Sequence, residues 1–249
     1  MDSGVVPADK ASDFEDPGVP VGRRVVLGLL AAAAAGVLGG ASIQRGLSAV
    51  LGPIGNHDPT GLVGLLPVGN TFRFYSVTRG APRRDASNYR LDITGLVGTP
   101  YSLTLPELQA MPQTTLVRDF QCVTGWRVPE VRWSGVRLAD LLDHAKVDST
   151  ATAVRFISFD GTYTESLTLA QARRDDVLVA LEMIDGPVTH DHGGPVRLYV
   201  APMYGYKSCK WLSGIELTRE VEPGYWEYRG YSIDGWVGAS NGRDDDPTS

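Results

Sequence analysis

The stretch VRDFQCVTGWRVPEVRWSG, residues 117–135, places Cys122 between a strand-like run and a Thr-Gly turn that is flanked by aromatic residues. A lone cysteine at the end of a strand is most often a small buried side chain. Three arginines lie close to it in sequence, Arg118, Arg127 and Arg132, and they would favour the thiolate, the form that binds soft metals. Spacing alone leaves both interpretations open.

The whole chain has the composition of an ordinary folded protein. It has 249 residues, of which 43% are hydrophobic and 21% charged, enough for one large domain with appendages. A formal net charge of −6 argues against a general nucleic-acid binder, which needs a basic face. The two cysteines are too few for a disulfide framework and too far apart for a zinc knuckle, although a pairing of Cys122 with Cys209 stays open.

The N-terminal residues 1–44 are typical of a targeting segment. A polar lead ends at Arg23 and Arg24, and an uncharged apolar run follows over residues 25–44. This pattern fits a twin-arginine export signal or a single membrane anchor. The alanine and glycine content favours the export signal, and the lack of a clear cleavage site leaves retention as an anchor open. Either interpretation places the rest of the chain on the extracytoplasmic side of the cytoplasmic membrane.

After this segment the chain divides into a linker, one domain and a tail. Residues 45–70 are rich in glycine and proline without periodicity and predict a linker. The domain is expected over residues 71–238, and the small, polar and acidic residues 239–249 predict a disordered tail.

Within the domain, strand patterns outnumber helix patterns. Two T-x-x-E/Q capping boxes predict short helices at 105–111 and 169–174, and an apolar stripe predicts a third over 136–145. These helices interrupt the strands without a regular βαβ rhythm, which indicates a mixed α+β domain. Strands are predicted from alternation or β-branched enrichment at 89–97, 114–123, 153–161, 177–183, 195–202 and 214–220.

A basic segment lies near the end of the domain. Between Asp191 and Glu216 the chain carries Arg197, Lys207 and Lys210 and no acidic residue, together with glycines and Ser208. Such a combination can hold a phosphate with backbone amides, a hydroxyl and ammonium groups, although a solvated cationic face has the same composition.

Two hydrolase patterns have weaker support. His190 and His192 form an H-x-H pair that a zinc hydrolase would use, but no third ligand stands at a recognisable spacing. The chain has no G-x-S-x-G motif for a serine hydrolase.

Three segments together resemble the molybdopterin-binding domain of the sulfite oxidase family. They are FRFYSV (72–77), DFQCVTGW (119–126) with RWSGVRL (132–138), and HGGPVRLYVAPMYGYKSCKWLSGIELT (192–218). The similarity is greatest to small bacterial periplasmic members such as the catalytic subunit of the methionine-sulfoxide reductase system, and it covers roughly residues 70–222. It implies a strand-rich, mixed α+β fold of the sulfite oxidase type.

The resemblance assigns roles to individual residues. It implies a molybdenum-pterin cofactor whose metal is bound by the Cys122 thiolate, and it gives catalytic roles to Cys122, Arg73 and Arg127. Contacts with the pterin cofactor would come from the backbone of Cys209 and from Arg73, Tyr75, Ser76, Ser158, His192, Arg197, Lys207, Ser208 and Lys210.

The reaction that the resemblance implies is oxygen-atom transfer on a small substrate, with electrons exchanged with a separate carrier such as a membrane cytochrome or a quinone-linked subunit. Sulfite would need cations near the metal, and the resemblance implies that Arg73 and Arg127 supply them. A sulfoxide-type substrate would suit an aromatic pocket lined by Trp126, Tyr163 or residues 225–236. The alternative is a catalytically inactive, membrane-tethered module of the same fold that binds an anionic ligand.

Overall fold

The computed structural model describes residues 72, 76–78 and 81–248. The predicted signal or anchor (1–44) and the predicted linker (45–70) lie outside the described residues, as do Arg73 and Tyr75. Within the described part, no helix has the length and apolar character needed to cross a membrane.

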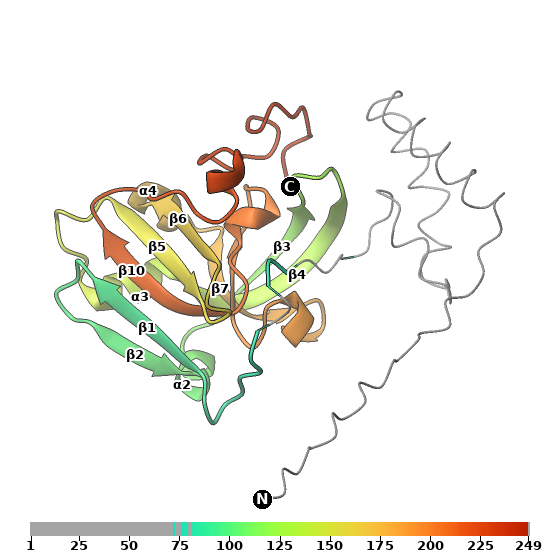
Figure 1. Ribbon diagram of the computed structural model, residues 1–249. Helices are drawn as coiled ribbons and strands as arrows, with labels where there is room; N and C mark the ends of the chain where they lie inside the picture. Colours follow the sequence, from blue (N-terminus) through green and yellow to red (C-terminus); the bar gives the residue numbers. More distant parts are fainter. Residues whose placement is uncertain (1–71, 73–75, 79–80, 249) are drawn as a thin grey trace, which may run out of the picture. The chain divides into compact units, whose positions relative to one another are not determined.

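Two sheets form the framework (Figure 1). In the first, β1 and β10 run parallel and the other neighbouring strands are antiparallel, so the strand that follows Lys210 lies beside the first strand of the domain. The order in this sheet is β2 (Tyr101–Thr104), β1 (Arg90–Gly95), β10 (Leu212–Thr218), β5 (Ala153–Ser158) and β6 (Thr164–Thr168).

The second sheet carries the Cys122 motif. Its strands are β3 (Thr114–Gln121), β4 (Arg127–Arg137), β7 (Val177–Met183) and β8 (Gly186–Pro187), in that order, and β9 (Arg197–Val200) also pairs with β7. Strands β3 and β4 form a long antiparallel hairpin, and Cys122 lies at its turn. Strand β9 starts at Arg197, the first cation of the basic segment. The second sheet therefore contains both this segment and the hairpin that carries Cys122.

The three predicted helices are confirmed, in shorter form. They are α2 (Leu105–Ala110), α3 (Leu138–Ala145) and α4 (Leu169–Ala172), and both capping boxes form, at Thr104 with Glu107 and at Thr168 with Gln171. Three single turns of 3₁₀ helix follow in the second half of the chain: η2 (His190–His192), η3 (Gly205–Lys207) and η4 (Glu227–Arg229). The mixed, strand-rich α+β class predicted from the sequence is correct.

Two apolar clusters stabilise the sheets. The larger one lies against the first sheet and α3, with Phe156, Leu141 and Ile215 fully buried. The smaller one contains Trp133 and Tyr199, whose rings stack at 4.1 Å between centroids. This second cluster extends to Phe120 and forms the floor beneath the site described next.

The C-terminal residues 239–248 make defined contacts with the domain. Asp245 accepts a hydrogen bond from the Tyr204 hydroxyl at 2.9 Å, and the Thr248 hydroxyl donates to the carbonyl of Ala201 at 2.8 Å. The sequence predicts disorder here because these residues are small and polar.

Candidate active site

A tight turn presents Cys122 at the end of β3. The Cys122 amide donates to the carbonyl of Trp126 at 2.9 Å, and the Gly125 amide donates back to the Cys122 carbonyl at 3.0 Å. Gly125 has φ of +105°, a conformation that favours glycine. The Thr124 hydroxyl donates to the Cys122 Sγ atom at 3.2 Å, an interaction that stabilises negative charge on sulfur. The C-V-T-G-W sequence therefore encodes a turn that displays one sulfur atom.

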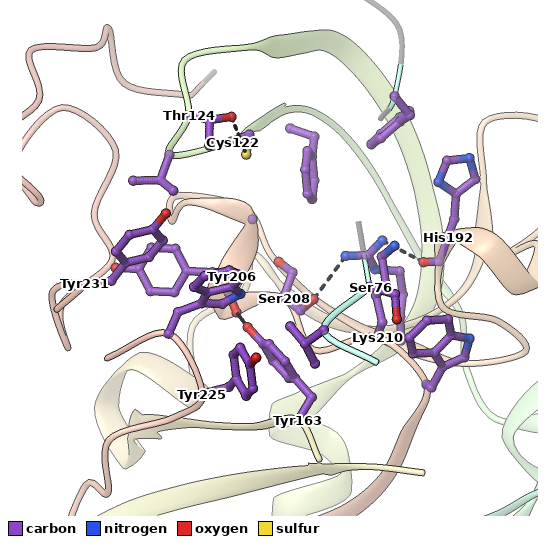
Figure 2. A pocket seen from close by; sticks show the side chains of 18 of the residues that line it. Ser76, Cys122, Thr124, Tyr163, His192, Tyr206, Ser208, Lys210, Tyr225 and Tyr231 are labelled. Atoms are coloured by element: carbon purple, nitrogen blue, oxygen red, sulfur yellow. Dashed lines mark hydrogen bonds between the residues drawn. The ribbon is translucent and has the colours of Figure 1, made fainter. Parts of the chain in front are cut away.

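A cavity of about 440 Å³ opens beside this sulfur (Figure 2). Figure 2 shows Cys122 near Thr124, with Tyr206, Tyr225 and Tyr231 to one side and His192 and Lys210 to the other. Six of the residues that the resemblance selected line this one cavity: Ser76, Cys122, His192, Arg197, Ser208 and Lys210.

Arg197 anchors the cationic end of the cavity, which we define as His192, Arg197, Ser208 and Lys210. It is only 2% exposed, and its guanidinium donates to the carbonyls of His192 at 2.7 Å, Ser208 at 3.1 Å and Leu198 at 3.3 Å. Burial lowers its pKa to about 10, which leaves it charged at neutral pH. The guanidinium thus joins the His192 loop to the Ser208 loop while it contributes positive charge.

Lys210 completes this end. Its Nζ donates to the carbonyl of Asp191 at 2.8 Å. Gly193 has φ of +99°, and a Cβ atom there would lie 2.7 Å from the Lys210 Cβ, so only glycine lets this loop close on the lysine. Burial, followed by the charge of Arg197, lowers the pKa of Lys210 to about 7. Burial, with both cations, also lowers the pKa of His192.

These pKa shifts predict a pH-dependent anion site in the cofactor-free protein. The folded pKa of Lys210 lies below that of a free lysine, so charging Lys210 costs stability; this cost is fully present below about pH 7 and disappears as the pH rises toward about 10. An anion offsets the cost. Sulfate, whose charge stays constant, should therefore raise the melting temperature more at about pH 6 than at about pH 8.5.

Lys210→Met is the control for this measurement. It should remove the pH dependence of the sulfate effect, because the group that titrates near neutrality is gone. Persistence of the pH dependence in Lys210→Met would assign it to His192 and contradict the role given to Lys210.

Four selected residues do not reach the cavity. The Ser158 side chain lies in its own turn and accepts from the Asp160 amide at 3.1 Å. Cys209 is fully buried, burial raises the pKa of its thiol, and its Sγ lies 3.4 Å from the Lys210 carbonyl. Both cysteines are free thiols, so the Cys122–Cys209 pairing is absent.

Lys207 and Arg127 also point elsewhere. Lys207 is 1% exposed, does not line the cavity and forms ion pairs with two buried glutamates. Arg127 pairs with Asp119 at 3.2 Å, donates to Gln121 at 2.6 Å and also donates to the carbonyl of Asp246. With these partners Arg127 does not line the cavity beside Cys122, and its catalytic role stays a prediction.

Opposite the cationic end stands an aromatic wall, defined as Tyr206, Tyr225, Trp226 and Tyr231. The rings of Trp226 and Tyr231 stack at 5.3 Å between centroids. Tyr163, which also lines the cavity, stacks on Tyr225 at 5.9 Å. The sequence indicated Tyr163 and the 225–236 stretch as aromatic lining, but Tyr206 was missed because it stands among the basic residues of its loop.

The H-x-H pair does not form a metal site. His190 packs against the ring of Trp211, and only His192 lines the cavity. Within the part of the chain that the structure describes, no three His, Cys, Asp or Glu side chains gather as metal ligands. A zinc centre built on His190 and His192 is therefore unsupported.

The donor set suits a molybdenum-pterin cofactor. A single accessible thiol can supply one soft ligand and leave the other metal positions to the cofactor and the reactants. The cationic end offers a buried guanidinium, an ammonium and a hydroxyl, the groups that bind a phosphate. The cavity volume lies in the range of small-molecule and cofactor sites.

Comparisons with known proteins agree with this chemistry. The family model described as oxidoreductase molybdopterin binding domain matches residues 78–226. The chain is 35% identical over 151 residues to the uncharacterized oxidoreductase YuiH of Bacillus subtilis, with 61% of this chain and 76% of that protein covered. It is 33% identical over 156 residues to the putative protein-methionine-sulfoxide reductase subunit YedZ1 of Azospira oryzae, with 63% and 58% covered.

Other matches include sulfite oxidases. The chain is 29% identical over 180 residues to sulfite oxidase of Arabidopsis thaliana, with 59% of this chain and 46% of that protein covered. The chain thus spans only about half of some of its relatives. The solved structure of the sulfane dehydrogenase SoxCD from Paracoccus pantotrophus matches with a TM-score of 0.53 at 23% identity, covering 57% of this chain and 41% of that one, which supports the fold.

The thiol-bearing turn, the cationic end and the family match over most of the domain lead to one conclusion: the chain belongs to the oxidoreductase molybdopterin-binding domain family, with the sulfite-oxidase-type fold and a molybdenum-pterin cofactor.

Proposed function

We propose that the chain reduces a neutral sulfoxide-type substrate by oxygen-atom transfer. The proposal rests mainly on the composition of the cavity: an aromatic wall forms one side of it, and the cations that line it among the described residues belong to the other side. The molybdenum-pterin cofactor supplies the two-electron redox chemistry. In the overall reaction the substrate S–O bond breaks, two electrons and two protons are taken up, and a thioether and water form.

The residues of the chain divide this work. Cys122 would hold the metal, the cationic end would bind the cofactor's phosphate, and Ser76 would lie along the same side. The aromatic wall would exclude water and pack against the thioether carbons of the substrate. Sulfite would gain less from this wall, because an anion without a nearby cation loses its hydration without compensation.

Sulfite oxidation remains the second candidate, since the relatives include sulfite oxidases and Arg73 lies outside the described residues. Arg127, the other arginine expected to serve it, is already paired with Asp119. The catalytically inactive anion-binding module has less support, because a phosphate binder needs no thiol at Cys122.

Steady-state assays with an artificial redox dye separate the two substrates. We expect kcat/KM for reduction of methionine sulfoxide to exceed kcat/KM for oxidation of sulfite by at least about 100-fold, since a site matched to one polarity discriminates strongly against the other. Trp226→Ala should reduce the value for the sulfoxide and leave the molybdenum content unchanged. A preference for sulfite would overturn the proposed substrate and favour the second candidate.

The electrons would come from a separate carrier, as a membrane cytochrome or a quinone-linked subunit. In support, the relative from Azospira oryzae is named as a putative subunit of a protein-methionine-sulfoxide reductase. We further propose that residues 1–44 direct export to the extracytoplasmic side of the membrane, with or without retention as an anchor. Mass spectrometry of the N-terminus of the exported protein distinguishes cleavage from retention.

A further inference from the structure

A buried charge cluster lies directly behind the aromatic wall. Lys207, in η3, donates through Nζ to Glu165 of β6 and to Glu227 of η4, the latter at 2.9 Å. The side chains are 1%, 0% and 2% exposed, respectively. The Oε2 atoms of both glutamates are buried, and neither finds a hydrogen-bond partner in the described part of the chain. One ammonium group therefore stands between two carboxyl groups that are shielded from bulk solvent.

The two glutamates of this cluster are not equivalent. Burial raises the pKa of Glu165 well above its usual value; the Lys207 charge opposes the shift and the Glu227 charge adds to it. Tyr163, Tyr206 and Cys209 are other titratable groups that interact with the cluster. The raised pKa of Glu165 favours its protonated form. The two carboxyl groups also differ in place, because Glu165 belongs to β6 of the first sheet, whereas Glu227 belongs to η4 and directly follows Trp226.

The same lysine lies beneath residues 224–241, called here the wall segment, which supplies Tyr225, Trp226 and Tyr231 of the aromatic wall. A Cβ atom added to Gly235 would overlap the Lys207 stem, so the segment is pressed onto it. The Tyr204 amide donates to the Gly235 carbonyl at 2.7 Å, and the Tyr206 hydroxyl donates to the Ser232 carbonyl at 2.7 Å. Glu227 directly follows Trp226, so its ion pair ties this part of the segment to η3.

We propose that Lys207 and Glu227 are positioning residues: their ion pair holds the wall segment against η3 and so fixes the aromatic wall beside Cys122. This role rests on the proposed function only in that the wall is taken to contact the substrate. It assigns to Lys207 a task different from the cofactor contact that its neighbours Ser208 and Lys210 suggest.

Kinetics of the molybdenum-loaded enzyme test the proposal with matched variants. Lys207→Met and Glu227→Gln should raise KM for methionine sulfoxide on the order of tenfold while kcat changes little, the pattern of lost substrate binding. Glu165→Gln keeps an oxygen that can accept from Lys207 and leaves the Lys207–Glu227 ion pair in place, so both constants should stay close to those of the unmodified enzyme. Lys207→Arg keeps the charge and should restore most of the affinity that Lys207→Met loses. Molybdenum per chain should equal that of the unmodified enzyme in all four variants.

Hydrogen exchange supplies a readout that does not depend on turnover. The amides of Tyr225, bonded to Thr164, and of Tyr204, bonded to Gly235, should exchange faster in Lys207→Met and Glu227→Gln and at the normal rate in Glu165→Gln. Failure of the unmodified enzyme to reduce the sulfoxide would contradict the proposed function. The exchange rates would still show whether the ion pair holds the wall segment.

Two results would overturn the proposal. Loss of molybdenum from Lys207→Met with normal exchange of these amides would return Lys207 to the cofactor. Equal exchange in Glu165→Gln and Glu227→Gln would show that the ion pair has no special part in holding the segment. Should Lys207→Met fail to fold, Glu227→Gln and Lys207→Arg carry the same comparison.

Discussion

Replacement of Cys122 by serine is expected to abolish turnover while the chain stays folded. The Cys122 Sγ is the one sulfur that lines the cavity among the described residues, and serine offers a harder, more basic oxygen that suits molybdenum poorly. Loss of a group that merely orients a metal ligand costs roughly 10- to 100-fold, so loss of the ligand itself should cost more than about 100-fold. Steady-state turnover with the redox dye measures the effect.

Cys209→Ala is the matched control. The Cys209 thiol is fully buried and does not line the cavity, so its removal should leave kcat within a few-fold of normal. Normal turnover in Cys122→Ser, or an equal loss in Cys209→Ala, would contradict the assignment of the metal ligand to Cys122.

Arg197→Met should cost both stability and cofactor. The guanidinium donates to three backbone carbonyls in the interior, and each buried group left without its partner costs about 1 to 3 kcal/mol. The free energy of unfolding should therefore fall by about 3 kcal/mol or more. Molybdenum per chain should fall as well, because the cationic end loses its permanent charge. Denaturant unfolding and metal analysis measure the two effects.

Two further variants show whether shape or charge matters more. Arg197→Lys keeps the charge but lacks the planar fork that reaches several carbonyls at once, so stability should fall while part of the cofactor binding remains. Arg118→Met removes an exposed arginine that donates to the carbonyl of its neighbour Val117 at 2.9 Å, and should change stability by less than about 0.5 kcal/mol. Full molybdenum content in Arg197→Met would contradict the account of the cationic end.

Local signals in the sequence predicted the elements that form locally. The capping boxes at Thr104 and Thr168 place both helix starts, since the cap bonds span only three residues. The strand over 177–183 is predicted at its observed bounds because it is buried on both faces and almost continuously apolar. Strands β2 and β6 are short and polar, and each forms by antiparallel pairing with the strand that precedes it in the sequence. The parallel pairing of β1 with β10 leaves no local signal.

The candidate site likewise contains parts that local sequence signals predict and parts that they do not. The Cys122 turn and the loop around Lys210 can be recognised as motifs, because their glycines and polar groups stand close together in the chain. Lys207 belongs to the same motif by sequence, yet its direction is set by Glu165 and Glu227, which lie far from it in the chain. Arg127 likewise turns toward Asp119 across the hairpin. The sequence could not predict these ion pairs, because the partners meet only when the chain has folded.

X-ray absorption at the molybdenum edge tests the central claim most directly. The enzyme is expressed in a host that makes the cofactor, and its spectrum is compared with that of Cys122→Ser. The account predicts molybdenum in the unmodified enzyme, with one sulfur neighbour fewer in the variant. A molybdenum-free enzyme, or identical sulfur counts in the two proteins, would contradict it.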